Sequence, residues 1–467
     1  MIIKQINLKN FRGYEEFFLT FSPTAFTLLV GENGSGKTAA LEGISIGLSA
    51  YFQGFHLIPS RNISHDDIHL KKYLKGSSAN AEPQFPVEIS CIGNTREKTD
   101  DINWHRKLNS LKGKTTRKEA SSLINFAKKL QSKVMNGEDI NLPIICYYGT
   151  QRLWNNDTRI KRTDVAKLTS RTHAYLDSLN PDFNVKLLTQ WFIDKKWVLI
   201  EDGIESGEMK AVQKAIQTCL VDLEISGQPN ENWQLDYSMK NKELQFTFSN
   251  GEVLPFRLLS DGYRNTIGMV ADIAFRMASL NPHLEENAVL ETPGIIIIDE
   301  LDLHLHPKWQ RRIVDDLKRT FPKIQFIAST HSPFIIQSIE EGELRILKNN
   351  GQVLNGGFVS TEQEYIQLEY ADESIEDVIE NIMGIEMPQR SRRKTAMYNA
   401  AKEYFETLKI MKDTNATSSQ IKILKEKLDV LSLPYIDNVA YYAFLQQKRV
   451  TAELEKERED SDNASRE

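Results

Sequence analysis

The chain has 467 residues, of which 40% are hydrophobic and 26% charged, a composition typical of soluble globular proteins with two or three domains. No apolar run reaches the roughly 18–20 residues that a bilayer-spanning helix needs, and the start lacks a signal peptide, so we expect a cytoplasmic protein without membrane segments. The net charge of -6 excludes a global positive field that would attract nucleic acid, so any such contact requires a local basic patch.

The chain opens with a strand–loop–helix pattern that carries a phosphate-binding motif. Residues 2–10 and 14–21 alternate apolar and polar side chains, as two antiparallel strands do. A short apolar run at 25–30 leads into a glycine-rich loop, and residues 37–52 have helical periodicity. The loop matches GxxxxGK[ST] with the sequence Gly31-Glu32-Asn33-Gly34-Ser35-Gly36-Lys37-Thr38. Its glycines let the backbone wrap phosphates with the N–H groups pointing inward.

This loop predicts a nucleotide ligand, with a chance glycine-rich turn as the alternative. Lys37 is expected to reach the β- and γ-phosphates, which also gives it a catalytic role, and the Thr38 hydroxyl to bind Mg²⁺. The helix that begins near Lys37 adds the positive end of its dipole. Four further residues of the loop are expected to contact the nucleotide: Asn33, Gly34, Ser35 and Gly36.

Two segments interrupt the predicted nucleotide-binding domain. Residues 63–141 are the first, with strands expected at 85–92 and 102–108 and a helix at 118–135. Residues 155–251 are the second, with predicted helices near 185–197 and 207–223 and strands near 233–239 and 242–248. Neither carries sustained heptads, so a long coiled-coil arm is excluded.

Between these segments, residues 142–148 form a buried-strand pattern that ends at Gln151. Gln151 is expected to contact Mg²⁺ and the attacking water. An exposed loop glutamine is the alternative interpretation.

A second phosphate-contacting turn, Leu259-Ser260-Asp261-Gly262, precedes a predicted helix within 258–281. The Ser260 hydroxyl and the N–H groups at Gly262 and the helix start are donors for a phosphate. One chain already supplies Lys37 and Thr38 to the γ-phosphate, so we expect Ser260 and Gly262 to act on the nucleotide of another copy across a two-fold axis. An ordinary Ser N-cap is the alternative.

Residues 294–299 form an apolar strand that ends in two carboxylates, Asp299 and Glu300. Asp299 is expected to hold Mg²⁺ through water, and Glu300 to orient and deprotonate the attacking water. A helix is predicted at 308–321 and a buried strand at 324–329, followed by His331, whose imidazole can bond the γ-phosphate and act in catalysis. A solvated strand end and a capping histidine are the alternatives.

The C-terminal part is predicted to be helical over 361–450, with a disordered acidic tail at 451–467. Its carboxylates are scattered at helical surface spacing, as on a solvated face, and His331 is the last histidine. A histidine-based nuclease site after residue 331 is therefore excluded. Four aromatic residues of this region are candidates for a partner contact and equally for the core: Tyr435, Tyr441, Tyr442 and Phe444.

The densest basic cluster is a candidate for phosphate-backbone binding, although a solvated loop is the favoured interpretation because Trp104 is the lone nearby aromatic. Its members are His105, Arg106, Lys107, Lys112, Lys114, Arg117 and Lys118. A smaller candidate contains Arg390, Arg392, Arg393 and Lys394.

The motifs and their order resemble ABC-type ATPase heads, which transporters, SMC proteins and RecF-like proteins share. Asn10-Phe11-Arg12-Gly13-Tyr14 is similar to the opening of SMC and RecF-type heads, which implies that Arg12 contacts ATP. The resemblance implies an α/β fold, an ABC-type P-loop NTPase head whose mixed sheet has N-terminal antiparallel strands. The head is then expected at 1–62, 142–154 and 252–360, with short α/β insertions replacing a coiled coil and a helical C-terminal region.

Within this group, Asp299 to Gln310 and Thr330-His331-Ser332-Pro333 resemble the stand-alone bacterial ATPases of the Septu anti-phage system (the PtuA family) and of retrons. His306 stands where transporter heads carry an aspartate, which argues against a transporter. The resemblance implies an ATPase that uses ATP and Mg²⁺, forms homo-oligomers through its heads, and controls a separate HNH nuclease of the PtuB type through the C-terminal helices. Nucleic acid would be contacted through the complex. A RecF- or SMC-like ATP-dependent DNA clamp in repair is the alternative.

Overall fold

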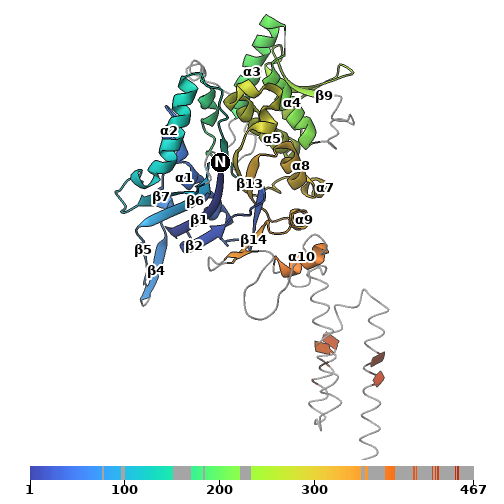
Figure 1. The fold of residues 1–467 in the computed structure, drawn as a ribbon. Helices are drawn as coiled ribbons and strands as arrows, with labels where there is room; N and C mark the ends of the chain where they lie inside the picture. Colours follow the sequence, from blue (N-terminus) through green and yellow to red (C-terminus); the bar gives the residue numbers. More distant parts are fainter. Residues whose placement is uncertain are drawn as a thin grey trace, which may run out of the picture. The chain divides into compact units, whose positions relative to one another are not determined.

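A computed structural model describes residues 1–75, 78–95, 100–150, 170–181, 185–203, 205–220, 233–348, 353–355 and 374–383, with isolated helical positions further on. The chain divides into two compact units, Met1–Val378 and Ile379–Glu467. All strands of the described residues lie in the first unit (Figure 1). None of the described helices is both long enough and apolar enough to span a bilayer.

A six-stranded sheet forms the centre of the first unit. Its order is β15 (Val353–Asn355), β14 (Leu344–Leu347), β3 (Phe26–Val30), β13 (Ile324–Ser329), β12 (Gly294–Ile298) and β8 (Ile144–Tyr148). The five strands from β14 to β8 run parallel, and β15 is antiparallel at the edge. Every residue of β3, β8, β12 and β13 is buried, as expected of parallel strands covered on both faces.

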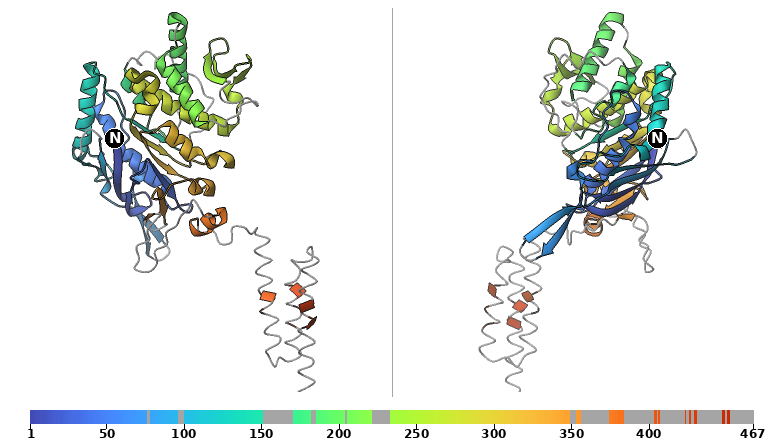
Figure 2. Two further views of the ribbon diagram at one scale, coloured as in Figure 1. Left: turned by 45° about the vertical axis from the view of Figure 1, so that its right-hand side comes forward. Right: turned by 90° about the vertical axis from the view of Figure 1, so that its left-hand side faces the viewer.

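A second, antiparallel sheet has the order β2 (Tyr14–Thr20), β1 (Ile2–Phe11), β6 (Val87–Asn94) and β7 (Ile102–Leu108). The last two strands come from the segment 63–141, so this segment extends the N-terminal sheet. A hairpin of β4 (Leu70–Lys75) and β5 (Ser78–Pro83), which the sequence analysis did not predict, projects from this side of the unit (Figure 2).

Helix α1 (Lys37–Leu48) lies between the two sheets and contacts strands of both. Two glycines one turn apart make this close approach possible. A Cβ atom on Gly43 would stand 2.8 Å from the Leu8 side chain, and one on Gly47 would stand 2.7 Å from Cys91 Sγ. The sheets are also joined directly, because the Gln325 side chain bonds both the N–H and the carbonyl of Ile3 at 2.8 Å.

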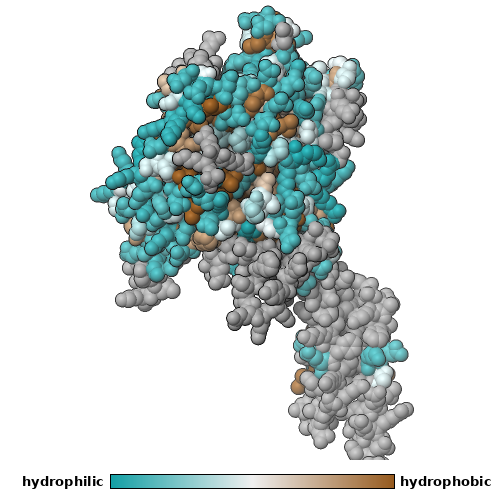
Figure 3. All heavy atoms as spheres, in the orientation of Figure 1, coloured by the Kyte–Doolittle hydropathy of each residue, from teal (hydrophilic) through white to brown (hydrophobic). Residues whose placement is uncertain are grey.

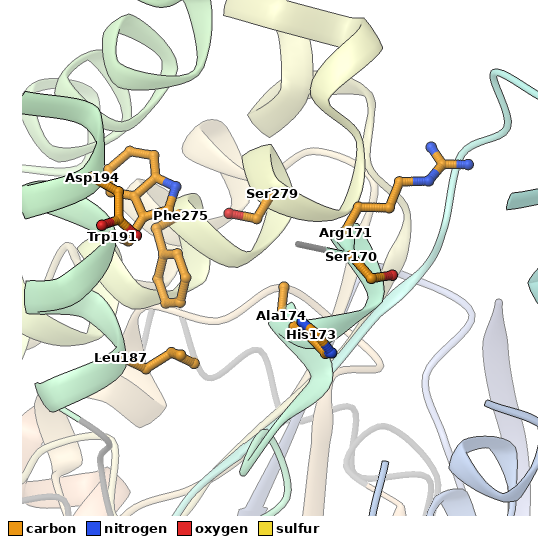
Figure 4. Close-up of a pocket in the computed structure, with 9 residues that line it drawn as sticks. All are labelled: Ser170, Arg171, His173, Ala174, Leu187, Trp191, Asp194, Phe275 and Ser279. Atoms are coloured by element: carbon orange, nitrogen blue, oxygen red, sulfur yellow. The ribbon is translucent and has the colours of Figure 1, made fainter. Parts of the chain in front are cut away.

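A helical layer completes the unit, with α2 (Ser121–Met135) on one side and α3 (Val185–Asp202), α4 (Gly207–Cys219) and α5 (Asp261–Leu280) on the other (Figures 1 and 2). A small sheet of β9 (Trp233–Ser238), β10 (Glu243–Phe248) and β11 (Val253–Pro255) accompanies them. Trp191 of α3 packs on Phe275 of α5 with ring centroids 5.8 Å apart, beside a cavity of about 90 Å³ (Figure 4).

The predicted helix at 308–321 is wrong in one respect, because the structure holds two helices there. These are α7 (Pro307–Gln310) and α8 (Ile313–Thr320). The backbone of Arg312 departs from helical dihedrals (φ -124°) and separates them. Trp309 of α7 packs edge-on against Tyr263 of α5, with centroids 4.7 Å apart, which fixes the direction of the first helix.

The surface of the unit is mainly hydrophilic on the face shown in Figure 3, with apolar side chains gathered near its middle and at the tip over α3. At that tip Trp197 is 50% and Ile200 56% exposed. The interior is apolar, and Cys91, Cys146 and Cys219 are buried free thiols.

Candidate functional site

The glycine-rich loop connects β3 to α1, and its backbone conformation depends on two glycines. Gly34 (φ 85°) and Gly36 (φ 95°) lie in the left-handed region, which costs other residues energy. Tyr14 of β2 lies under the loop, where its hydroxyl donates to the Ser35 carbonyl at 3.2 Å. A Cβ on Gly36 would overlap that tyrosine hydroxyl, so both backbone and packing require glycine here.

Lys37 is the first residue of α1, and its amine lies inside the loop. Its Nζ donates to the carbonyls of Gly31 at 2.8 Å and Glu32 at 3.0 Å. Burial lowers the Lys37 pKa, while the charges of three carboxylates, Asp299, Glu300 and Asp302, act to raise it. The structure therefore brings the predicted phosphate-binding amine and the predicted acidic strand end into one site.

Ser329, the last residue of β13, holds both predicted carboxylate residues at the neighbouring end of β12. Its hydroxyl donates to Asp299 Oδ1 at 2.5 Å and accepts from the Glu300 N–H at 2.8 Å. Asp299 is 1% exposed, whereas Glu300 is half-buried. Glu300 also has a positive φ of 48°, which is uncommon for a non-glycine residue and is held here by its neighbours.

Asp302 is a site residue that the sequence analysis did not assign. Its Oδ1 accepts from the Thr330 hydroxyl at 2.5 Å and from the His331 N–H at 3.1 Å. This carboxylate therefore joins the loop after β12 to the loop after β13, and it positions the backbone of the predicted catalytic histidine. The sequence holds no signal for this role, because the acceptor and its donors lie 28 and 29 residues apart.

The oxygen ligands suit Mg²⁺, which prefers carboxylate and hydroxyl oxygens. Thr38 is exposed at the start of α1, and Asp299 lies at the end of β12. The third predicted ligand, Gln151, lies outside the described residues, but the strand before it is placed. β8 pairs with β12, and the Asp299 N–H donates to the Tyr148 carbonyl at 2.8 Å.

Ser260 and Gly262 stand at the start of α5. Ser260 is the N-cap residue and is exposed, and its hydroxyl makes no capping bond to the described first turn, unlike an ordinary Ser N-cap. Gly262 packs on the loop after β12 so closely that a Cβ there would overlap the His304 carbonyl. The turn is thus fixed from within the chain, while the Ser260 side chain faces outward.

Arg12 is occupied by two carboxylates in this structure. Its guanidinium bonds Asp67 at 2.8 Å and Glu42 of α1. Glu42 also accepts from Arg61 at 2.6 Å, so it lies between two arginines. These two bonds involve Nε and Nη2 of Arg12, so the predicted contact of Arg12 with ATP would use its other guanidinium N–H groups or replace one of these partners.

A buried polar network connects α5 to β8. The Tyr148 hydroxyl donates to Asp272 Oδ2 at 2.7 Å, and Arg276 Nε donates to the same oxygen at 2.8 Å. Burial acts to lower the Arg276 pKa, but Asp272 raises it, and the net pKa is raised. Asp272 and Arg276 lie one turn apart on α5 and are each 2% exposed, so the bond from the Tyr148 hydroxyl to Asp272 is what links this helix, whose N-cap is Ser260, to the strand that precedes Gln151.

Comparison with known proteins shows which family this chain matches and which proteins it resembles. A family model described as an AAA ATPase domain matches residues 1–336. The retron Vc95 probable ATPase of Vibrio cholerae is 26% identical over 74% of this chain and 73% of its own length. The Septu protein PtuA of Bacillus thuringiensis is 25% identical over 83% of this chain and 85% of its own length. The resemblance to Septu and retron ATPases is confirmed.

Two further similarities are shorter or weaker. The DNA replication and repair protein RecF of Salmonella typhimurium is 31% identical over 107 residues, 23% of this chain and 29% of its own length. A solved SMC head bound to the C-winged helix domain of ScpA covers 79% of this chain and 99% of its own, with 16% identity and a TM-score of 0.45. The family match over residues 1–336 and the two observed sheets confirm the predicted α/β P-loop ATPase head.

Proposed function

Because the chain belongs to the family of the AAA ATPase domain, we propose that it is the ATP-binding and ATP-hydrolysing regulatory subunit of a bacterial anti-phage defence complex. The names of its Septu and retron relatives support the defence role. One observation carries the ATPase assignment. The Lys37 amine lies close enough to Asp299, Glu300 and Asp302 for their negative charges to act on its pKa. One amine for phosphates and carboxylates for metal and water are the parts that phosphoryl transfer to water needs.

In this proposal each residue has one task. Lys37 gives up its two loop carbonyls and bonds the β- and γ-phosphates instead. Thr38 and Asp299 hold Mg²⁺, which neutralises charge on the phosphate oxygens when bound. Glu300 accepts a proton from the attacking water. His331, whose backbone Asp302 fixes, donates to the γ-phosphate.

Two copies close over the nucleotide. The exposed Ser260 hydroxyl and the N–H groups at Gly262 complete the γ-phosphate site of the facing copy. Each nucleotide is then held by Lys37 of one protomer and Ser260 of its partner, so hydrolysis loosens the dimer. This coupling turns ATP turnover into a change of oligomeric state.

The proposed effector is a separate HNH nuclease of the PtuB type, bound through the helices predicted at 361–450. Most of this region, with the aromatic candidates Tyr435 to Phe444 and the basic residues Arg390 to Lys394, lies outside the described residues. The assembled complex is also proposed to contact nucleic acid.

The test is co-expression with the product of the adjacent open reading frame, followed by purification and nuclease assays with and without ATP. We expect a stable complex whose cleavage depends on the nucleotide. A complex with the Glu300→Gln variant should assemble equally well, but its nuclease should stay either active or inactive once ATP has bound. Two separate proteins, or cleavage that ignores ATP, would reject the regulatory role.

A repair clamp is the second candidate, and the RecF similarity favours it. It predicts duplex DNA binding that appears only with ATP and that the Glu300→Gln variant prolongs. The defence ATPase predicts nucleotide-dependent control of a nuclease partner. The two assays therefore separate the candidates.

A further inference from the structure

A polar pocket lies at the end of α1 that is opposite the glycine-rich loop. α1 spans Lys37–Leu48, about 18 Å at 1.5 Å per residue, and the pocket begins in the turn that follows it. The pocket has a volume of about 720 Å³. Its polar wall consists of six residues: Gln53, Ser60, Asn62, Lys114, Thr115 and Arg117. None of the described residues that line it is an aspartate or a glutamate.

Arg106 lies behind this wall. The sequence placed it in a basic cluster that could contact a phosphate backbone, and this prediction is wrong for Arg106. Its side chain is completely buried. Among the described residues its hydrogen-bond partners are all uncharged, including the carbonyls of Ile46 at 3.1 Å and Arg61 at 2.6 Å. The carbonyl of Ile46 belongs to the last turn of α1, where a cation is favourable. Arg106 therefore brings a buried positive charge without a carboxylate partner in the described part of the chain.

The buried guanidinium orients a donor at the pocket. Asn62 Oδ1 accepts from Arg106 Nη2 at 2.8 Å. Because the amide oxygen is committed, the NH₂ group of this exposed side chain points away from Arg106 and remains available. The Ser60 hydroxyl also bonds Arg106, at 3.4 Å, and joins it to the same wall.

Arg117 is fixed in a similar way. Its Nε donates to Gln53 Oε1 at 2.7 Å, and Gln53 Nε2 donates to Ser60 Oγ at 3.1 Å. A guanidinium held through Nε still presents two N–H₂ groups, the fork that binds phosphate oxygens. Among the described residues neither Arg117 nor Lys114 has an ion-pair partner, whereas Lys107, from the same basic cluster, pairs with Glu88 at 3.3 Å.

Electrostatics leave this pocket short of negative charge. Burial and, to a smaller extent, the charge of Arg117 together lower the pKa of Arg106 to about 10. Two exposed cations and an amide donor line a space much larger than a single ion, and the buried cation Arg106 lies behind them. An anion in this space would offset the mutual repulsion of Arg106 and Arg117.

We propose that this pocket binds phosphate groups of a nucleic-acid duplex backbone. The donors suit phosphate oxygens, and the volume admits more than one phosphate. The neighbouring aromatic Trp104 is 1% exposed and donates its Nε1–H to the Gly47 carbonyl at 2.9 Å, so it offers no ring to a base. Contact is thus to the backbone, without reading of sequence.

The test is fluorescence anisotropy with a labelled 30-base-pair DNA duplex and the full chain, without ATP, over a series of salt concentrations. Lys114→Gln/Arg117→Gln should weaken binding by about tenfold near 0.1 M salt and reduce the slope of log affinity against log salt by about 1.8, from roughly 0.9 per lost phosphate contact. Lys112→Gln/Lys118→Gln removes the same charge from the same segment but from side chains outside the pocket wall, and should change affinity less than twofold.

Equal losses in the two double variants would overturn the proposal, because they would indicate a diffuse field. So would wild-type protein that fails to bind the duplex. ATP hydrolysis should be unchanged in both double variants, so a failure of this inference is distinguishable from a failure of the ATPase assignment.

Discussion

The carbonyl of His304 lies where a side chain on Gly262 would stand. This contact joins the turn that carries Ser260 to the loop that follows Glu300, within one chain. The His304 backbone has a positive φ of 61°, so the loop is held in an uncommon conformation on its side of the contact. The position of the exposed Ser260 hydroxyl therefore depends on the absence of a Cβ at residue 262.

Gly262→Ala should abolish ATP-dependent dimer formation and leave ATP binding to the monomer intact. The new Cβ would displace the turn, whereas Lys37 and its loop do not touch it. Light scattering coupled to size-exclusion chromatography measures the dimer. Gly13→Ala is the matched control, because a Cβ there meets nothing within 4 Å. A Gly262→Ala protein that still dimerises with ATP would show that this turn does not form the interface.

Glu300→Gln should bind ATP and lose turnover by at least about a hundredfold, since the amide cannot accept the proton of the attacking water. ATP should then hold the protein as a long-lived dimer. Phosphate release and chromatography with ATP measure the two effects. Turnover near the wild-type rate would assign the base to another residue.

Asp302→Ala should reduce the hydrolysis rate about tenfold or more, because the loop of His331 would lose its acceptor and shift. ATP affinity should change little, since Asp302 contacts neither the glycine-rich loop nor its lysine by hydrogen bond in the described structure. Asp302→Asn keeps an oxygen that accepts from the His331 N–H and should retain most of the rate. Equal rates for the two variants would exclude the proposed positioning role.

The affinity for ATP should fall as pH rises through the alkaline range below 10.5. Burial lowers the pKa of Lys37 in the nucleotide-free protein, whereas a bound phosphate favours the charged amine. The charged form binds, so affinity is constant where Lys37 is protonated and is lost as it deprotonates. Nucleotide titrations with Mg²⁺ at several pH values check this sign. Affinity that increases with pH would contradict the role of the amine.

The sequence predicted the parts of the site that are continuous along the chain. Lys37 follows its glycine loop directly, and Asp299 follows an apolar strand, so the pattern of neighbouring residues was enough to predict both. Asp302 was missed and Arg106 was misjudged, because the role of each depends on partners far away in sequence. Arg106 is buried on β7 between half-buried His105 and Lys107, but the run of charged residues around it led to its prediction as a surface residue. The antiparallel sheet was likewise half predicted, since β6 pairs with β1 across about 80 to 90 residues and β7 then pairs with β6.

The central claim is a nucleotide shared between two protomers, and a mixing experiment tests it most directly. Lys37→Ala should be inactive because it cannot bind ATP, and Ser260→Arg should be inactive because it cannot complete the partner's site. An equal mixture should regain about a quarter of wild-type ATPase activity, because half of the dimers are mixed and each has one intact site. A mixture that remains inactive, or a Ser260→Arg protein that hydrolyses ATP alone, would contradict the shared site.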